Sequence, residues 1–452
     1  MSQTRELALD ILLDIDKKKN LSHLVLSDTL RNYQFMEKKD RAFLTRLCQG
    51  TLENQIQIDY IIDQFSKVKI HKCKPVIRAI LRMGVYQLKF MNQVPDSAVC
   101  NEAVKLAKKR GFRNLTGFVN GVLRNIARNL DQVIYPDQEK EPVRYLSVWY
   151  SMPEWLVKEF LSEYDKTTVE KMLESFLEVK ETSIRAQLTN GTMEELRRSL
   201  EAQQVVVGKG AFMKEAFRIS GYNYLEDLDA FCEGKFQVQD ESSMLVAQLA
   251  DPKEGMLVID VCSAPGGKSL HMADRLKGTG RVIARDLTEY KAELIQENVD
   301  RLKCTNVKVQ VADARILDEE LIGKADIVIA DLPCSGLGIM GRKRDIKYNA
   351  TKDGILELSK LQKQILSVVI QYLKPNGILM YSTCTIRKEE NIENVQWMSK
   401  NLDMELVGFE ELMPDQLTVE TAEEGYIQLL PGVHPCDGFF IAKLRRKSNA
   451  GY

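Results

Sequence analysis

Two cysteines occupy similar positions in this sequence, each just after an apolar run that is typical of a β-strand. Cys334 lies in "ADLPCSG" and Cys384 lies in "YSTCTI". The thiolate is the reactive form of cysteine and forms readily beside basic residues, and Arg387 and Lys388 follow Cys384 closely. The pair therefore predicts thiol chemistry at neighbouring strand ends. The alternative is that both are small side chains buried where strands end.

Strand and helix patterns alternate regularly in the C-terminal part of the chain. Apolar runs of strand length occur at 257–262, 281–287, 307–314, 325–334 and 377–384, with helical patterns between them. This alternation predicts a Rossmann-like, parallel, doubly wound α/β sheet with helices on both faces. Such sheets bind ligands at the carboxyl ends of their strands. The polar and thiol residues that fall there are Cys262, Asp286, Asp313, Asp331, Cys334 and Cys384.

A glycine-rich loop, "DVCSAPGGKS", follows the first of these strands. Its pair Gly266-Gly267 lets the backbone approach a ligand closely, and the next helix presents free N–H groups. A phosphate-binding P-loop is excluded because Cys262 occupies the position of its first glycine. The dinucleotide pattern G-x-G-x-x-G is also absent.

The second strand ends at Asp286, where an acidic side chain can accept hydrogen bonds from both hydroxyls of a ribose. Asp313 follows the third strand, where it could reach an adenine amino group. An adenosine ligand without a pyrophosphate indicates S-adenosylmethionine. Each aspartate could instead cap its helix. This alternative is weaker for Asp286, Asp313 and Asp331 together, because all three lie at the ends of predicted strands.

Methyl transfer to nitrogen or oxygen needs no thiol, whereas transfer to C5 of a pyrimidine does, because that carbon is a poor nucleophile. A thiolate that adds to C6 makes C5 able to attack a methyl group. The C5 proton must then leave and the thiolate must be expelled, and a second thiol can serve that release. Cys334 and Cys384 together therefore predict methylation of a pyrimidine carbon.

The motifs "DVCSAPGGKS", "ADLPCSGLG" and "YSTCTIRKEEN" resemble those of RNA cytosine-C5 methyltransferases, a resemblance that covers about residues 236–446. It implies that Cys384 is the nucleophile, that Cys334 assists product release, and that Asp331 holds the cytosine edge. Ser263 stands where this family more often has alanine. The cofactor contacts that the resemblance implies are Cys262, Ser263, Ala264, Pro265, Gly266, Gly267, Lys268, Asp286, Asp313 and Asp331.

The first 130 residues carry helical patterns throughout, for example in "KPVIRAILRMGVYQLKFM" and "NEAVKLAKKRG". In "NEAVKLAKKRG" we predict that Asn101 is the N-cap of the helix and that Gly111 ends it. Residues 61–130 contain 14 Lys or Arg against 3 Asp or Glu, although the whole chain has a net charge of −1. A basic module on an otherwise acidic chain favours nucleic-acid binding. A solvated lysine face is the alternative.

This N-terminal part resembles the helical RNA-binding fold of the antitermination factor NusB, as in "VPDSAVCNEAVKLAKKRGFRNLTGFVNGVLRNI". The whole layout is similar to the bacterial small-subunit ribosomal RNA methyltransferase B subfamily. The resemblance implies a 16S ribosomal RNA substrate whose loop cytosine is flipped out, with phosphate contacts that position the RNA. We expect a monomer that needs no metal.

Three domains are predicted: a helical NusB-like domain over 1–132, a linker with a small α/β module over 133–235, and the catalytic domain over 236–452. The N-terminus does not resemble a signal peptide, and no apolar stretch is long enough to span a membrane. Nine cysteines without a secretory signal indicate reduced thiols. We therefore expect a cytoplasmic protein.

Three other functions compete with this interpretation. A zinc cytidine deaminase would need a cysteine three positions after Cys334 and a His-x-Glu element, and the sequence has neither. A transfer RNA cytosine-C5 methyltransferase would share every catalytic motif. A non-catalytic ribosome-assembly or antitermination factor would be expected to have lost one or both thiols.

Overall fold

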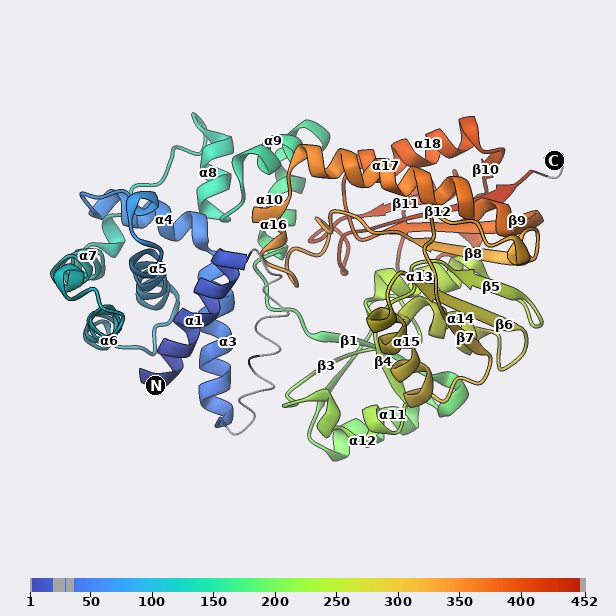
Figure 1. Cartoon of the computed structure of the whole chain (residues 1–452), viewed down its shortest axis with the longest axis horizontal. Coiled ribbons are helices and arrows are strands. Elements are labelled where there is room, and N and C mark those ends of the chain that lie inside the picture. The colour runs from blue at the N-terminus through green and yellow to red at the C-terminus, as the bar shows by residue number, and fades with distance from the viewer. Residues whose placement is uncertain (1, 19–28, 30–35, 448–452) are drawn as a thin grey trace. The chain divides into compact units, whose positions relative to one another are not determined.

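The computed structural model describes residues 2–18, 29 and 36–447 (Figure 1). The chain folds into two compact units. The first, called here the helical unit, comprises residues 1–178 and 340–349. The second, called here the α/β unit, comprises residues 179–339 and 350–452. Within the described ranges, no helix combines the length and the apolar character needed to cross a bilayer.

The helical unit is built around helix α5, which packs against all the other helices of its core. Gly84 of α5 permits the close approach of α7, because a Cβ atom at this position would lie 2.6 Å from Leu123 Cδ2. The core helices are α1 (Ser2–Lys18), α3 (Lys38–Glu53), α4 (Gln55–Phe65), α5 (Pro75–Phe90), α6 (Asp96–Lys109) and α7 (Thr116–Arg128). The unit also contains α8 (Pro142–Trp149), α9 (Glu154–Glu163), α10 (Lys166–Ser175) and α16 (Ile346–Asn349).

The start of α6 differs from the prediction. Asn101 lies inside this helix, which begins five residues earlier at Asp96, directly after Pro95. A helix rarely extends back through a proline, which is tolerated only at or near its start, so Pro95 marks the N-terminus of α6. Asp96 then places a negative charge at the positive end of the helix dipole. The predicted stop is confirmed, since α6 ends at Lys109 and Gly111 has a φ of +86°.

Residues 340–349 join the helical unit although they follow Cys334 by only a few positions. Arg344 donates to the Glu53 carboxylate at 2.7 Å, and the Lys347 ammonium donates to the Glu53 carbonyl at 2.8 Å. Lys347 is 3% exposed, and burial lowers its pKa to about 7. Tyr348 places its hydroxyl 3.3 Å from that of Ser151. A segment that connects the motifs of Cys334 and Cys384 is thus anchored by buried polar groups of the helical unit.

The α/β unit contains a small antiparallel sheet of order β2-β3-β1-β4. Its helix α11 begins at a capping box in which Thr192 and Glu195 satisfy each other's backbone N–H groups. The elements are β1 (Thr182–Ala186), α11 (Met193–Ala202), β2 (Val206–Lys209), β3 (Ala216–Ser220), α12 (Asp229–Cys232) and β4 (Phe236–Val238).

The large sheet of the α/β unit has the order β10-β12-β9-β8-β5-β6-β7, and β11 pairs with β12. Strands β5 to β9 pair in parallel, whereas β10, β11 and β12 pair antiparallel to their neighbours. The strands are β5 (Leu257–Asp260), β6 (Arg281–Asp286), β7 (Val307–Val311), β8 (Ala325–Asp331), β9 (Leu373–Thr383), β10 (Met404–Leu406), β11 (Tyr426–Leu429) and β12 (Phe439–Arg446).

Helices cover both faces of this sheet (Figure 1). On one face Val258 and Ile327 pack in a core with α13 and α14, and on the other Ile259 and Val328 pack in a core with α17 and α18. The helices are α13 (Glu241–Ala250), α14 (Gly267–Arg275), α15 (Glu289–Arg301), α17 (Lys352–Val369) and α18 (Ile392–Asn401). The predicted doubly wound fold is confirmed, and its strand order reverses between β5 and β8, where such folds bind ligands.

Candidate active site

The two thiols lie side by side at the carboxyl ends of β8 and β9. These strands are parallel neighbours with Asp331 opposite Ser382, so the segments that follow them begin at the same edge of the sheet. The Sγ atoms of Cys334 and Cys384 are 3.4 Å apart. The hydrogen bond with Cys384 and burial raise the pKa of Cys334 well above its usual value. Cys334 therefore holds its proton tightly and would be a strong base once deprotonated.

Asp331, the last residue of β8, is held from two sides. Its Oδ2 accepts from the Lys268 ammonium at 2.7 Å, and its Oδ1 accepts from the Ser382 hydroxyl at 2.8 Å. Lys268 also lies 5.0 Å from the centroid of the Phe439 ring. The structure thus joins Lys268, which is predicted to contact the cofactor, to Asp331, which is predicted to hold the edge of the target cytosine.

The glycine loop after β5 is tightly closed. Gly266 has a φ of +104°, and a Cβ atom there would lie 3.2 Å from Leu270 Cδ1, so glycine suits both the conformation and the space. The Ser263 hydroxyl lies 2.7 Å from that of Ser269, which donates to Asp260 at 2.7 Å. The serine that departs from the family pattern therefore has a partner within the loop.

Asp286 ties this loop to the end of β6. Its carboxylate accepts from the backbone N–H groups of Ala264 at 3.0 Å and Leu287 at 2.8 Å, and from the Lys291 ammonium at 2.9 Å. Leu287 beside it is 54% exposed and offers an apolar surface. The structure therefore places Asp286 against the glycine loop, and its contact with a ribose stays a prediction.

Two other predicted cofactor residues have different surroundings. Asp313, just beyond β7, forms an ion pair of 2.6 Å with Arg315, and their hydrogen bonds hold the pKa of Asp313 below its usual value. Burial, together with the negative charges of Asp260 and Asp286, raises the pKa of Cys262. Cys262 is therefore suited to packing and not to nucleophilic attack.

The residues around this loop fit S-adenosylmethionine. Asp260 is fully buried beneath the loop, and its Oδ1 has no hydrogen-bond partner within the described part of the chain. Burial raises the pKa of Asp260 to about 7, with a smaller contribution from Asp331. A ligand that carries a positive charge near these two carboxyl groups would compensate their repulsion. Asp260 was not predicted from the sequence, although it opens the quoted motif.

A second set of residues missed from the sequence holds the loops that carry the thiols. Glu390 is fully buried and accepts from the backbone N–H of Ser335 at 2.8 Å and from its hydroxyl at 2.5 Å. The amide of Asn391 donates to the Thr385 carbonyl at 3.0 Å. Both residues belong to the quoted motif "YSTCTIRKEEN", but no spacing rule connects them to Ser335.

Arg387, predicted to favour a thiolate at Cys384, pairs with Glu389 at 2.7 Å. The role of Arg387 beside Cys384 stays a prediction. Across residues 2–18 and 36–447, no group of three or more His, Cys, Asp or Glu side chains is arranged to hold a metal ion.

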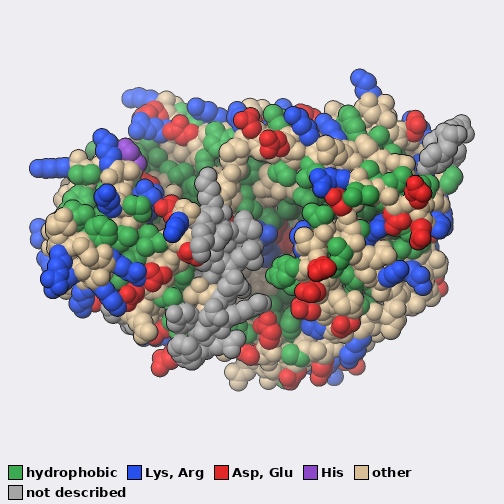
Figure 2. Space-filling model, viewed as in Figure 1, with side chains coloured by type: hydrophobic (Ala, Val, Ile, Leu, Met, Phe, Trp, Pro, Cys, Tyr) green, Lys and Arg blue, Asp and Glu red, His purple; other side chains and the backbone are tan. Residues whose placement is uncertain are grey.

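The helical unit presents many basic side chains to solvent (Figure 2). Asn125 of α7 donates to the carbonyl of Phe65 at 3.1 Å, which brings α7 beside the end of α4. Other basic residues of the unit are neutralised, for example Lys109 by Glu6 at 2.6 Å. The exposed Lys and Arg side chains of 61–130 that form no ion pair with another described residue are Lys67, Lys72, Lys74, Lys108, Arg113, Arg124 and Arg128.

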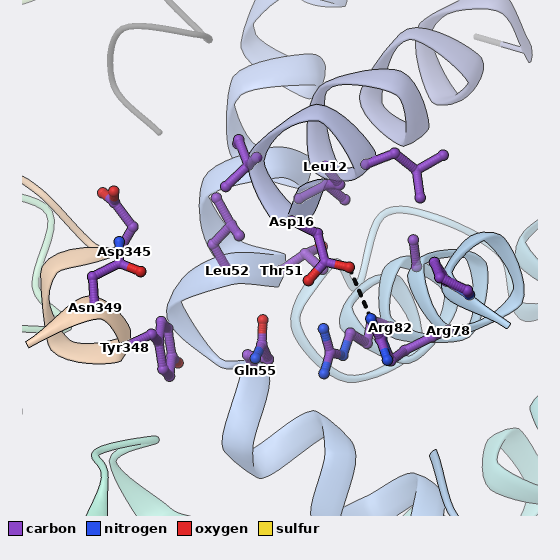
Figure 3. Close-up of a pocket in the computed structure, with 14 residues that line it drawn as sticks. Leu12, Asp16, Thr51, Leu52, Gln55, Arg78, Arg82, Asp345, Tyr348 and Asn349 are labelled. Carbon is purple, nitrogen blue, oxygen red and sulfur yellow. Dashed lines mark hydrogen bonds and ion pairs between the residues drawn. The ribbon is translucent and has the colours of Figure 1, made fainter. Parts of the chain in front are cut away.

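A cavity of about 190 Å³ lies in the helical unit between α1, α3, α5 and α16 (Figure 3). Two arginines line it, but both are engaged by carboxylates. Arg78 pairs with Asp16 at 2.8 Å, and Arg82 pairs with Asp59 at 2.6 Å. We therefore place no phosphate contact in this cavity.

Comparison with known proteins identifies the family. Residues 247–445 match the family of 16S rRNA methyltransferase RsmB/F, and residues 2–128 match the NusB family. A probable ribosomal RNA small subunit methyltransferase B of Bacillus subtilis (strain 168) is 35% identical over 454 residues, which covers 99% of each chain. The chain belongs to the RsmB/F family of 16S rRNA methyltransferases. A probable member from Synechocystis sp. (strain ATCC 27184 / PCC 6803 / Kazusa) is 31% identical and covers 99% of this chain and 100% of its own.

The protein in the crystal structure of PH0851 is 26% identical to this chain, with a TM-score of 0.81 and 98% coverage of both chains. The family resemblance and the fold class predicted from the sequence are thus confirmed. Methyltransferases of the RsmB/F family depend on S-adenosylmethionine, so the predicted cofactor is also confirmed. The domain boundaries and the roles of individual site residues stay predictions.

Proposed function

We propose that this rRNA methyltransferase modifies C5 of one cytosine in 16S ribosomal RNA, with Cys384 as the covalent nucleophile. The observation that carries the proposal is the 3.4 Å separation of the Cys334 and Cys384 sulfurs at adjacent strand ends. Methylation of nitrogen or oxygen needs no thiol, whereas a pyrimidine carbon must first be activated by a nucleophile. The names of the relatives support ribosomal RNA as the substrate.

In the first half of the reaction, the Cys384 thiolate adds to C6 of the cytosine. A C6–S bond forms, and the electron pair of the C5–C6 double bond makes C5 nucleophilic. S-adenosylmethionine, which the glycine loop and Asp286 would hold, would supply the methyl group to C5: its S–CH3 bond would break, and its sulfur would leave as a neutral thioether. Asp331, fixed by Lys268 and Ser382, holds the cytosine edge between cofactor and thiols.

In the second half, Cys334 gives up its own proton to solvent, and the C5 proton passes to the thiolate that remains. The electron pair of the C5–H bond restores the C5–C6 double bond, and the C6–S bond breaks with its electron pair returning to Cys384. One proton is released to solvent over the cycle. The raised pKa of Cys334 suits this role, because a more basic thiolate removes a carbon-bound proton more readily.

The exposed basic residues of the helical unit position the RNA through its phosphates. Lys67, Arg124 and Arg128 are the cations we assign to this surface. Because Cys384 must reach C6, the target base leaves its stack. We propose that the enzyme acts as a monomer in the cytoplasm.

The test compares wild type, Cys384→Ala and Cys334→Ala with 16S ribosomal RNA and S-adenosylmethionine on a denaturing protein gel. We expect Cys334→Ala to give an RNA-shifted band that survives denaturation, because the adduct forms but is not released. Cys384→Ala should give neither the band nor methylation, a loss of about 10³-fold or more. Cys232→Ala, which alters an exposed thiol, is the matched control.

Two outcomes would contradict the proposal. An adduct that requires Cys334 would reverse the two roles, and methylation by the double variant would mean that the target is no pyrimidine carbon. Transfer RNA in a parallel reaction tests the alternative substrate. A wild type that binds RNA without methylating it would favour an assembly factor.

A further inference from the structure

The carboxylate of Glu390 is held mainly by the segment that carries Cys334, although the hydroxyl of Thr385, beside Cys384, also interacts with it. Its carboxylate accepts from both the backbone N–H and the hydroxyl of Ser335, the residue directly after Cys334. Gln362 donates to the same carboxylate at 3.3 Å and to the carbonyl of Pro333, directly before Cys334, at 2.9 Å. Cys334 is therefore flanked on both sides by groups bound to one buried network.

The Cys384 segment is held by the neighbouring residue. The Asn391 side chain donates to the Thr385 carbonyl at 3.0 Å and accepts from the Thr383 hydroxyl at 2.5 Å. The main hydrogen bonds to the Cys334 segment thus come from Glu390, and the main ones to the Cys384 segment come from Asn391. The two segments also contact each other directly. Their sulfurs are 3.4 Å apart, the Gly338 N–H donates to the Cys384 carbonyl at 2.9 Å, and the hydroxyls of Ser335 and Thr385 lie 2.7 Å apart.

Burying the Glu390 carboxylate costs folding free energy, so its retention calls for a functional explanation. The side chain is fully buried, and among the residues that the structure describes it forms no ion pair with Lys or Arg. Neutral hydrogen-bond donors satisfy it, while burial keeps its pKa raised. Burying an acid without a cation is unfavourable for folding, so its place beside the thiols points to the reaction.

We infer that Glu390 is a positioning residue for product release, whose carboxylate fixes Ser335 and thereby holds the Cys334 sulfur against the C5 proton. This inference rests on the proposed covalent mechanism. Cys384 keeps its own support in Asn391, so it still forms the adduct when Glu390 is replaced. A displaced Cys334 then leaves the adduct unresolved.

The experiment measures two quantities in single-turnover reactions with 16S ribosomal RNA: adduct that survives denaturation and free methylated RNA. Glu390→Ala should accumulate adduct and slow the appearance of free product roughly tenfold to a hundredfold, as expected for misplacing a catalytic group. Glu390→Gln should be partly rescued, since its amide oxygen still accepts from the Ser335 N–H. Glu393→Gln, which alters an exposed acid three residues further along the chain, is the matched control and should behave as wild type.

Thermal melting by circular dichroism checks that each variant is folded. If Glu390→Ala does not fold, Ser335→Ala removes the hydroxyl contacts with Glu390 and Thr385 but keeps the backbone N–H bond to Glu390, and it should accumulate adduct to a smaller extent. Wild-type release by a folded Glu390→Ala overturns the inference. Loss of adduct and methylation together in that variant also overturns it, because Glu390 would then support Cys384. Cys334→Ala without an adduct would instead refute the covalent mechanism itself.

Discussion

The two units of this protein use charged side chains in opposite ways. The helical unit spreads its free cations over exposed positions, such as Lys72, Arg113 and Arg128, none of which is ion-paired within the described residues. The α/β unit gathers a few ionisable groups at the strand ends, where Asp331 and Glu390 surround Cys334. The first arrangement suits additive binding of a polyanion, and the second suits chemistry at one atom.

This difference teaches where a single substitution should matter. Removing one of many exposed cations leaves the others to hold the RNA, whereas each group at the strand ends has a partner that depends on it. Effects of substitution should therefore be graded and additive in the helical unit and steep in the α/β unit.

The largest effect that tests the comparison is expected for Asp331→Asn. The amide removes the negative charge that pairs with Lys268, so the ammonium is left without its counter-charge beside the thiols. We expect the single-turnover methylation rate to fall roughly 10²- to 10³-fold. Asp326→Asn, at the opposite end of β8, is the control, since its carboxylate pairs with Lys374 far from the site. Near-normal turnover in Asp331→Asn would break the contrast between the units.

An intermediate effect is expected for the triple variant Lys67→Gln, Arg124→Gln, Arg128→Gln. Each lost phosphate contact removes counterion release, so RNA affinity near physiological salt should fall roughly tenfold to a hundredfold, and the salt slope should decrease by about 2. Filter binding at several salt concentrations measures both, with Lys109→Gln as a control for a cation already paired to Glu6.

The triple variant also sharpens the comparison through its single members. Each one should weaken binding only a fewfold. If one substitution alone abolished binding, the helical unit would depend on a specific contact, and the additive description would be wrong.

The smallest effect concerns an exception in the helical unit, Lys347. Burial lowers its pKa from 10.5 to about 7. Between these values the unfolded chain binds the proton and the folded chain does not, so the free energy of unfolding should rise with pH above about 7. The slope is at most about 1.4 kcal/mol per pH unit. Lys347→Met cannot titrate, and denaturant unfolding from pH 7 to 9 should show a flatter dependence than wild type; equal slopes would contradict the pKa assignment.

Much of the α/β unit could be predicted because its signals are local. The five apolar runs between 257 and 384 correspond to β5 to β9, and strand order placed Cys334 beside Cys384. The antiparallel strands β10 to β12 were not predicted, since they pair by contacts that leave no mark in the spacing of apolar residues. The hydrogen bond between Ser335 and Glu390 spans 55 positions and was missed for the same reason.

One omission was local. Arg315 stands two positions after Asp313 and binds its carboxylate in the structure. Sequence spacing permits this pair but does not decide it, because the choice between a neighbouring arginine and a ligand depends on side-chain conformation. The helical unit shows the same limit at α6, where Pro95 and not Asn101 marks the start.

The segment 340–349 limits how the two units can be exchanged between related genes. It makes the helical unit discontinuous, because a strip encoded between two methyltransferase motifs completes it. A gene fragment for residues 179–452 would encode Arg344 and Lys347 without the Glu53 that receives them. Recombination between relatives can therefore exchange the helical unit cleanly only if both stretches move at once. The strip thus favours descent of the two units as a single evolutionary module.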